Sequence, residues 1–358
     1  MTRIFSNDDV TRLLTMDDCL AAMEEGYGEL GAGRAAFRTS SNIVTPTVHE
    51  GGVYALKSMD GVIPSLGVAA IRLNSDILTW KTSDDGSTRR VKKPAAPNNR
   101  WVGLVLLFST HTGEPLAIFP DGVMQRMRVG ATNGLAAKFM ARDDATTIGM
   151  IGSGWQAGAQ LMAVTKVRKI RDIRVYSPTQ ANREAFAREW SDKLGIPVTP
   201  VASVEDAVKD RDIVLCATSS LDTVFFKRHI EPGMHLSTIK GHEIEAAAVN
   251  ACDIKAVHMH EPPVTIIRTH GVGIGEDKHA SGVGLAEGID PKTMPNLADL
   301  IAGRGTKRTR PEQTSVFLND NGLGAQFAMC GAALYKRAVA ENAGVDLPTD
   351  WFTEDVHP

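Results

Sequence analysis

The segment TTIGMIGSGWQAGAQ, residues 146–160, constrains the fold more than any other part of the chain. An apolar run ends at Gly152, a second glycine follows at Gly154, and a helix-forming stretch begins directly afterwards. In a strand–turn–helix unit the first glycine allows the tight turn and the second lets the backbone approach a pyrophosphate. A third small residue, here Ala157, lets the helix pack on the strand. The pattern predicts dinucleotide binding at the helix N-terminus, with a simple packing turn as the alternative.

Strand-like and helix-like segments alternate after this turn. Helices are expected over residues 156–168, 180–194 and 203–209, and they alternate with the apolar runs TTIGMI, DIRVYS, IPVTPVA, DIVLCAT, MHLSTIK and IKAVHMH. Alternation of this kind indicates right-handed crossovers and a mainly parallel sheet. We therefore predict a Rossmann dinucleotide-binding domain over residues 126–310.

The preceding part of the chain has a different pattern. A helix is expected over residues 8–31, followed over 37–122 by short β segments that Gly, Pro and Asn separate, which is typical of an antiparallel sheet. Within them, 81–100 reads as a basic loop, either a solvated excursion or a substrate lid. The helix that begins in GLGAQF near the C-terminus is expected to return here. The prediction is an α/β protein with an α+β substrate-binding and dimerisation domain formed by 1–125 and 311–358.

Composition excludes several classes of partner. The 358 residues are 43% hydrophobic with a formal net charge of -3, so a large core forms without a field that attracts nucleic acid or an anionic membrane. The N-terminus lacks the features of a secretory signal, and no run of about 18 apolar residues occurs. Four widely spaced cysteines are expected to be buried, reduced thiols. We expect a cytoplasmic protein with a small-molecule partner.

A histidine-rich stretch raises the question of a metal. It contains His-x-His-Glu but lacks the usual ligand spacing, so we expect a loop after a Rossmann strand and no metal site. Its residues are His258, His260, Glu261, His270 and His279.

The second Rossmann strand bears on the choice of nucleotide. It ends in VYSPTQANR, which places Ser177 and Thr179 where a carboxylate would accept from the ribose 2′-hydroxyl of NAD. Arg183 follows one helical turn later, so a 2′-phosphate would meet hydroxyls and a cation. NADP is the preferred cofactor and NAD the alternative, because Arg183 could equally be a solvated helix residue.

Four motifs resemble the ornithine cyclodeaminase and μ-crystallin family, which includes alanine dehydrogenases and ketimine reductases. They are RVGATNGLAA at 128–137, IGSGWQ at 151–156, EPGMHL at 231–236 and SVFLNDNGLG near the end. The resemblance implies a homodimer whose N-terminal sheet pairs across the two-fold axis, with an inserted Rossmann domain. The complete set of expected cofactor contacts is Thr132, Gly152, Ser153, Gly154, Trp155, Gln156, Ser177, Thr179, Arg183, Ala217, Thr218 and Asn321.

The resemblance also implies substrate contacts. Arg38 and Arg128 match the arginines with which family members bind a substrate carboxylate, a grip suited to a bidentate guanidinium. Arg72 stands where cyclodeaminases have a lysine that moves protons, and arginine cannot readily give up a proton. Lys57 could replace that lysine, or it could be merely solvated at the rim of the sheet.

A second departure concerns proton transfer. His242 aligns with the aspartate that handles the amine in cyclodeaminases, and Glu243 follows it. Histidine can act as a general acid or base near neutral pH, with the neighbouring carboxylate as its partner. Alternatively, the pair caps the end of a strand.

Loss of the lysine and the aspartate argues against cyclodeamination and favours net hydride transfer. We expect an NAD(P)-dependent ketimine or imino-acid reductase, or an amino-acid dehydrogenase, in which Lys57 or His242 supplies the proton to nitrogen. Three arginines, Arg38, Arg72 and Arg128, favour a dicarboxylic or otherwise acidic imine. The alternatives are an ornithine or lysine cyclodeaminase and a μ-crystallin-like protein that binds NADPH and a small ligand.

Overall fold

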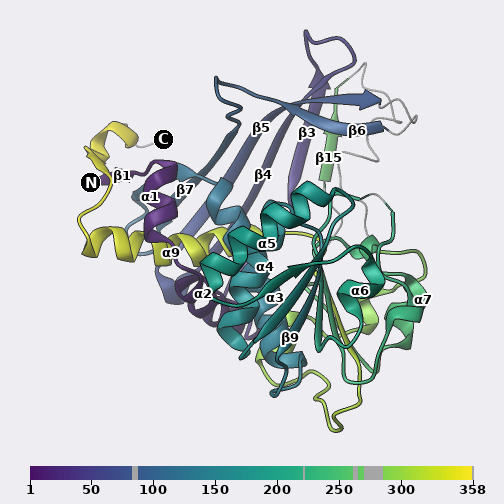
Figure 1. Cartoon of the computed structure of the whole chain (residues 1–358). Coiled ribbons are helices and arrows are strands. Elements are labelled where there is room, and N and C mark those ends of the chain that lie inside the picture. Colours follow the sequence, from purple (N-terminus) through teal and green to yellow (C-terminus); the bar gives the residue numbers. More distant parts are fainter. Residues whose placement is uncertain (83–87, 221, 261–264, 270–284, 357–358) are drawn as a thin grey trace.

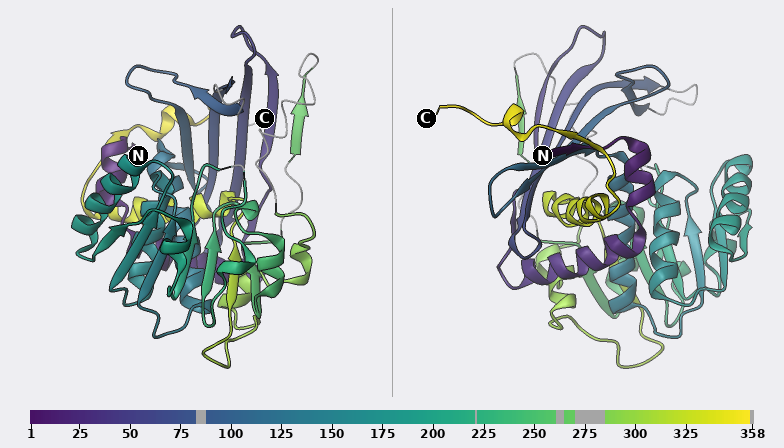
Figure 2. Two further views of the ribbon diagram at one scale, coloured as in Figure 1. Left: turned by 45° about the vertical axis from the view of Figure 1, so that its right-hand side comes forward. Right: turned by 90° about the vertical axis from the view of Figure 1, so that its left-hand side faces the viewer.

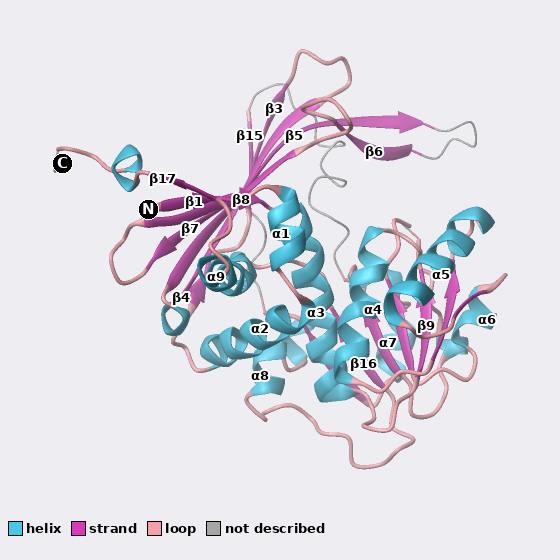
Figure 3. Cartoon of the chain, turned by 60° about the vertical axis from the view of Figure 1, so that its left-hand side comes forward, coloured by secondary structure: helices cyan, strands magenta, loops and turns pink. Residues whose placement is uncertain are grey.

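Two β-sheets organise the chain. The computed structural model describes residues 1–82, 88–220, 222–260, 265–269 and 285–356 (Figure 1). Within these ranges a ten-stranded sheet carries the N-terminal part and a seven-stranded sheet the central part. Figures 2 and 3 show helices α2 and α9 side by side against the first sheet, with the second sheet and its helices beyond them.

The first sheet has the order β15–β3–β4–β5–β7–β8–β1–β17, with β2 beside β4 and β6 beside β5. Its neighbours pair antiparallel, as predicted, except for the parallel pairs β1–β8 and β15–β3. The strands are β1 Thr2–Ile4, β2 Ala36–Phe37, β3 Ser41–Pro46, β4 Val53–Ile63, β5 Val68–Thr82, β6 Thr88–Lys93, β7 Val102–Ser109, β8 Pro115–Pro120, β15 Thr265–Arg268 and β17 Val345–Leu347.

Three helices pack against this sheet, namely α1 Asn7–Leu13, α2 Met16–Gly31 and α9 Gly324–Ala340. The single helix predicted over 8–31 is interrupted because Thr15 starts a new helix, its hydroxyl accepting from the Asp18 N–H at 3.2 Å. The return of α9 to the first sheet is confirmed. A Cβ at Gly61 would overlap Ala325, so glycine permits this close approach. We call the face of the sheet that α9 covers the inner face.

The second sheet has the order β11–β10–β9–β12–β13–β16–β14, and its strand pairs are all parallel. This confirms the predicted Rossmann fold. The strands are β9 Thr147–Ile151, β10 Asp172–Tyr176, β11 Val198–Pro200, β12 Ile213–Cys216, β13 His235–Thr238, β14 Ile254–Val257 and β16 Ser315–Leu318. The helices of this part are α3 Gly122–Met140, α4 Trp155–Val167, α5 Gln180–Leu194, α6 Val204–Val208, α7 Ala246–Ala251 and α8 Leu297–Ile301.

Three strands depart from the predicted boundaries, and two of them, β15 and β16, do so because their partners are distant in sequence. β6 lies in the predicted loop 81–100 and forms a hairpin with β5, while residues 83–87 lie outside the described ranges. β15 pairs with β3 of the first sheet although it falls within 126–310. β16 joins the parallel sheet although it falls within 311–358. The division of the chain into domains otherwise stays a prediction.

Membrane-spanning helices and disulfide bonds were not expected from the sequence. No helix in the described ranges is long and apolar enough to cross a membrane. The four cysteines are buried and free of disulfides, as predicted.

Candidate active site

The glycine-rich turn joins β9 to α4. Gly152 has φ +114°, and a Cβ there would overlap the Ala217 carbonyl oxygen of the neighbouring segment. Gly154 is the N-cap of α4, and a Cβ on it would meet nothing within 4 Å. Gly152 is therefore required by the fold, whereas Gly154 leaves open space in front of the first N–H groups of α4.

The packing of α4 against α5 depends on Gly158, a glycine that the dinucleotide motif does not include. Ala157 is fully buried, but a Cβ on Gly158 would overlap the Trp190 ring of α5 and the Arg126 guanidinium. The guanidinium of Arg126 stacks on Trp155, with 4.0 Å from its Cζ to the ring centroid.

A cavity of about 820 Å³ opens at the carboxyl ends of β9, β10 and β12. It holds most of the predicted cofactor contacts, namely Gly152, Ser153, Gly154, Trp155, Gln156, Ser177, Thr179, Ala217 and Thr218. Further lining residues that sequence reasoning missed include Asn182, Val204, Val224 and Phe226. Gln156 Oε1 is buried and has no hydrogen-bond partner among the described residues. The size, the open glycine turn and the position at a helix N-terminus suit a dinucleotide.

The end of β10 gathers hydroxyls and a cation. Ser177 Oγ lies 2.9 Å from Ser153 Oγ, and Arg183 Nη1 donates to the carbonyl oxygens of Ser177 at 3.0 Å and Pro178 at 3.3 Å. No Asp or Glu is among the described residues that line the cavity. The edge that would meet the adenosine ribose therefore offers no acidic side chain to repel a 2′-phosphate.

Three predicted cofactor contacts are not among the lining residues of this cavity, namely Arg183, which lies beside it at the end of β10, Thr132 and Asn321. Thr132 is fully buried on α3, where its hydroxyl donates to the Arg128 carbonyl oxygen at 2.8 Å. Asn321 lines a separate cavity of about 140 Å³ next to His258, with 2.6 Å from its carbonyl oxygen to His258 Nδ1.

Two of the three predicted substrate arginines are brought together, since Arg72 and Arg128 both lie over the Phe327 ring, whereas Arg38 is apart from them. Arg38 has a side chain 80% exposed and pairs with Asp60 at 2.8 Å. Because side chains alternate along a strand, Asp60 lies on the outer face of β4, opposite the face that carries the neighbouring Met59. Arg72 lies opposite Met59 in register and therefore belongs to the inner face.

Arg72 is neutralised by a residue that sequence reasoning missed. Its Nη2 lies 2.7 Å from Asp121 Oδ2, and both side chains are buried. Asn74 Nδ2 donates to the same oxygen at 3.2 Å. Gly103 makes room for this cluster, since a Cβ there would overlap Asp121 Oδ1. In the sequence, Asp121 could be recognised only as an aspartate directly before a helix, a position that is usual for a helix cap.

Arg128 has a different environment. It is buried on α3, and no carboxylate of the described residues lies within ion-pairing distance. Its Nη1 donates to Gln326 Oε1 at 3.0 Å, while its Nε is buried and has no acceptor among the residues that the structure describes. Burial, with the nearby charge of Arg72, lowers the pKa of Arg128 to about 10, so the guanidinium remains charged at neutral pH.

The two candidate proton donors differ in setting. Lys57 is half-buried on the inner face, in register with the buried Asn42 and Asn74 on its two sides. His242 is buried, and its Nε2 lies 3.1 Å from the carbonyl oxygen of Ser220, a residue of the dinucleotide cavity. His242 Nδ1 has no hydrogen-bond partner in the described ranges.

Glu243 holds two loops together. Its carboxylate accepts from the Thr218 N–H at 2.6 Å, the Thr238 hydroxyl at 2.6 Å, and the N–H groups of Ile239 and Lys240 at 3.1 Å each. These bonds join the segments after β12 and β13. Glu243 makes no hydrogen bond to His242 among those described, which favours the capping interpretation over the catalytic one.

Metal binding has no support in the described ranges, which contain no group of three suitable side chains. His258 and His260 each bond a backbone carbonyl, whereas Glu261, His270 and His279 lie outside those ranges.

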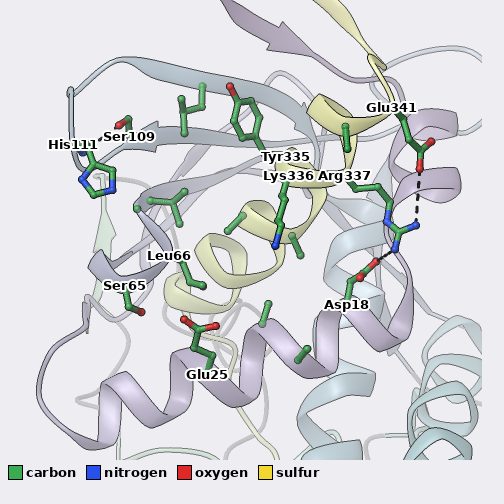
Figure 4. Close-up of a pocket in the computed structure, with 18 residues that line it drawn as sticks. Asp18, Glu25, Ser65, Leu66, Ser109, His111, Tyr335, Lys336, Arg337 and Glu341 are labelled. Carbon is green, nitrogen blue, oxygen red and sulfur yellow. Dashed lines mark hydrogen bonds and ion pairs between the residues drawn. The ribbon is translucent and has the colours of Figure 1, made fainter.

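A further cavity of about 830 Å³ lies between α2 and α9 (Figure 4). Small side chains of both helices leave the space, and an ion pair between Asp18 and Arg337 (2.7 Å) closes one end. It contains none of the predicted site residues and is separate from the dinucleotide cavity.

The parallel sheet, its open glycine turn and a buried arginine beside α9 define a dinucleotide-binding protein of the oxidoreductase type. Comparison with known proteins identifies the family. The model of the ornithine cyclodeaminase/mu-crystallin family matches residues 2–341. The chain belongs to this family.

Relatives within the family include reductases and dehydrogenases. A delta(1)-pyrroline-2-carboxylate reductase of Bacillus cereus is 29% identical over 251 residues, which cover 68% of this chain and 73% of the relative. An alanine dehydrogenase of Archaeoglobus fulgidus is 26% identical over 353 residues, 96% of this chain and 97% of the relative. The delta(1)-pyrroline-2-carboxylate reductase of Thermococcus litoralis, solved with NADH and L-proline, has a TM-score of 0.76 and 25% identity, covering 96% of this chain and 100% of its own.

Proposed function

We propose that the protein is an NAD(P)-dependent oxidoreductase that acts on a C=N or C–N bond next to a carboxylate, as an imino-acid reductase or amino-acid dehydrogenase. The main support for this proposal is the environment of Arg128. Its guanidinium is buried and charged, and within the described ranges it has no carboxylate partner and no acceptor for its Nε. A substrate carboxylate would satisfy both the charge and the donor. The reductase and dehydrogenase relatives support this assignment.

The substrate class follows from charge. The sequence favoured a dicarboxylate because three arginines were counted together. Arg38 pairs with Asp60 on the outer face and Arg72 with Asp121, which leaves Arg128 as the arginine of the three without an acidic partner in the described part of the chain. We therefore favour an imino acid with one carboxylate, and the pyrroline-2-carboxylate reductases among the relatives agree with that choice.

The nucleotide would supply or accept a hydride when bound. Gly154 and the start of α4 would hold its pyrophosphate, and either NAD or NADP fits the cavity. The NADP preference rests on the hydroxyls at the end of β10 and on Arg183.

In the reductive direction Arg128 would orient the carboxylate, and with it the adjacent imine carbon, for the hydride that the bound nucleotide would supply. The C=N electron pair moves to nitrogen, which takes a proton from Lys57 or His242. His242 is favoured by its contact with Ser220, which lines the cavity. Lys57 is favoured by its place on the inner face with Asn74.

The test is oxidation of NADH and NADPH by the purified protein across cyclic imino acids and α-keto acids with amines, followed by absorbance. Carboxylate-dependent oxidation is expected. Binding of NADPH without turnover across that panel would instead support the μ-crystallin-like alternative. Ammonia release from ornithine or lysine without net reduction would support a cyclodeaminase.

A homodimer is proposed from the outer face of the first sheet. Ile43, Val62, Ile71, Val102 and Leu104 point outward from β3, β4, β5 and β7, each between 36% and 41% exposed. Exposed apolar side chains gathered on one face of a sheet indicate an association surface. Light scattering should give a dimer mass, and Ile71→Lys with Leu104→Lys should give a monomer. A monomeric unmodified protein would contradict the proposal.

The cytoplasmic location expected from the sequence stays a prediction.

A further inference from the structure

The orientation of Arg128 is set by a neutral amide. Gln326 is fully buried on α9, and its Oε1 accepts from Arg128 Nη1 at 3.0 Å and from the Leu323 N–H at 2.9 Å. Its Nε2 donates to Thr132 Oγ1 at 2.7 Å and to the Tyr27 hydroxyl at 3.0 Å. Both donors and both lone pairs of the amide are therefore used. The side chain cannot rotate without breaking several buried hydrogen bonds.

The next residues of this network determine which way the amide points. His258 Nδ1 lies 2.6 Å from the Asn321 carbonyl oxygen, which can only accept, so Nδ1 carries the hydrogen. Burial lowers the pKa of His258 to about 3, so the ring is neutral and its Nε2 accepts from the Tyr27 hydroxyl. The Tyr27 oxygen then accepts from Gln326. The amide nitrogen must face Tyr27, and the amide oxygen must face Arg128.

The contrast with Arg72 shows what an amide acceptor changes. Asp121 fixes the Arg72 guanidinium and cancels its charge. Gln326 fixes the Arg128 guanidinium and leaves its charge intact. Gly322 brings the loop after β16 against this guanidinium, since a Cβ there would overlap Arg128 Nη1.

We infer that Gln326 is a positioning residue that orients Arg128 for the substrate carboxylate while keeping its positive charge available, and thereby selects imines that carry a carboxylate. The inference rests on the proposed function, because it specifies how that site would discriminate among imines. Tyr27 and His258 hold the Gln326 amide in one orientation.

Gln326→Glu tests this directly, because it keeps the shape of the side chain and places a carboxylate against Arg128. The ratio of kcat/KM for 1-pyrroline-2-carboxylate to that for 1-pyrroline, which lacks the carboxylate, should fall about ten- to a hundredfold. The loss should appear in the KM of the carboxylate substrate, with kcat for 1-pyrroline retained. Gln313→Glu is the matched control, because the Gln313 amide oxygen accepts three hydrogen bonds in another loop and its exchange should leave the ratio unchanged.

Gly322→Ala provides a second variant without a change of charge. Its Cβ should displace the Arg128 guanidinium and lower the same ratio, so the inference stays testable if Gln326→Glu does not fold. An equal loss of activity with both imines in the folded variants would show a merely structural role and overturn the inference, as would an unchanged ratio.

Calorimetry separates this inference from the proposed function. Pyrrole-2-carboxylate presents a carboxylate on an aromatic ring that a hydride does not reduce. In the presence of NADH it should bind the unmodified protein at least tenfold more tightly than Gln326→Glu. Absence of turnover in the unmodified protein would refute the proposed function, whereas equal affinity of the two proteins, or no binding to either, would refute the inference.

Discussion

The buried pair of Arg72 and Asp121 predicts a large and specific loss of stability in Asp121→Asn. The two side chains are 5% and 9% exposed, and 2.7 Å separates Arg72 Nη2 from Asp121 Oδ2. The exchange leaves the Arg72 charge buried without compensation and places an amide donor near Asn74, which donates to Asp121 at 3.2 Å. Removal of one member of a buried ion pair typically costs about 3–5 kcal/mol. We expect a loss in this range in the free energy of unfolding.

Urea unfolding followed by circular dichroism and by tryptophan fluorescence measures this loss as a shift in the transition midpoint. Glu189→Gln is the control, because the Glu189–Lys193 pair on α5 is about half exposed and such pairs contribute about 0–1 kcal/mol. Combining Asp121→Leu with Arg72→Met should recover much of the loss, since no charge is then buried. The reasoning is refuted if Asp121→Asn unfolds at the same urea concentration as the control.

Three further outcomes are expected. Gly152→Ala should abolish NADH binding, measured by fluorescence, and lower Tm, because a Cβ at φ +114° overlaps the Ala217 carbonyl; normal binding would contradict the assigned turn. Arg183→Ala should weaken NADPH binding about tenfold while leaving NADH binding unchanged, and equal effects would argue against a 2′-phosphate contact. Burial lowers the pKa of His235 and of His258 to about 3, so the unfolded chain binds protons that the folded chain excludes as pH falls below about 6.5. The free energy of unfolding should therefore decrease from pH 7 to pH 4 in urea titrations, and a His235→Asn variant should show a shallower decrease.

Local pattern was sufficient for much of the fold. The glycine turn and the following alternation predicted the parallel sheet, and α5 has the predicted bounds of 180–194. The break between α1 and α2 was missed because both helices bury apolar residues at helical spacing, and a single capping threonine decides the boundary. β6 was missed because its pairing with β5 follows a turn-rich segment that resembles a loop.

The two halves of the site differ in how far they can be predicted. Gly152, Gly154 and Ser177 could be predicted because the dinucleotide motif is contiguous in sequence and its geometry follows from one strand and one helix. Gln326 could not, because its role arises from α2, α3 and α9 meeting in the interior. Glu243 was assigned to His242 by adjacency in sequence, whereas its oxygens bind backbone and hydroxyl groups from two other segments.

Counting arginines without their acidic partners explains why the sequence favoured a dicarboxylate. Arg72 and Asp121 are 49 positions apart and meet only because β5, β7 and the start of α3 converge on the inner face. A site that grips two carboxylates needs two uncompensated cations, and Asp121 removes one of them. Asp121→Asn would return the charge of Arg72 to the site, so the same exchange that weakens the fold should improve binding of a dicarboxylic imine relative to a monocarboxylic one. The acidic partners of the arginines, rather than their number, therefore decide how many carboxylates this site accepts.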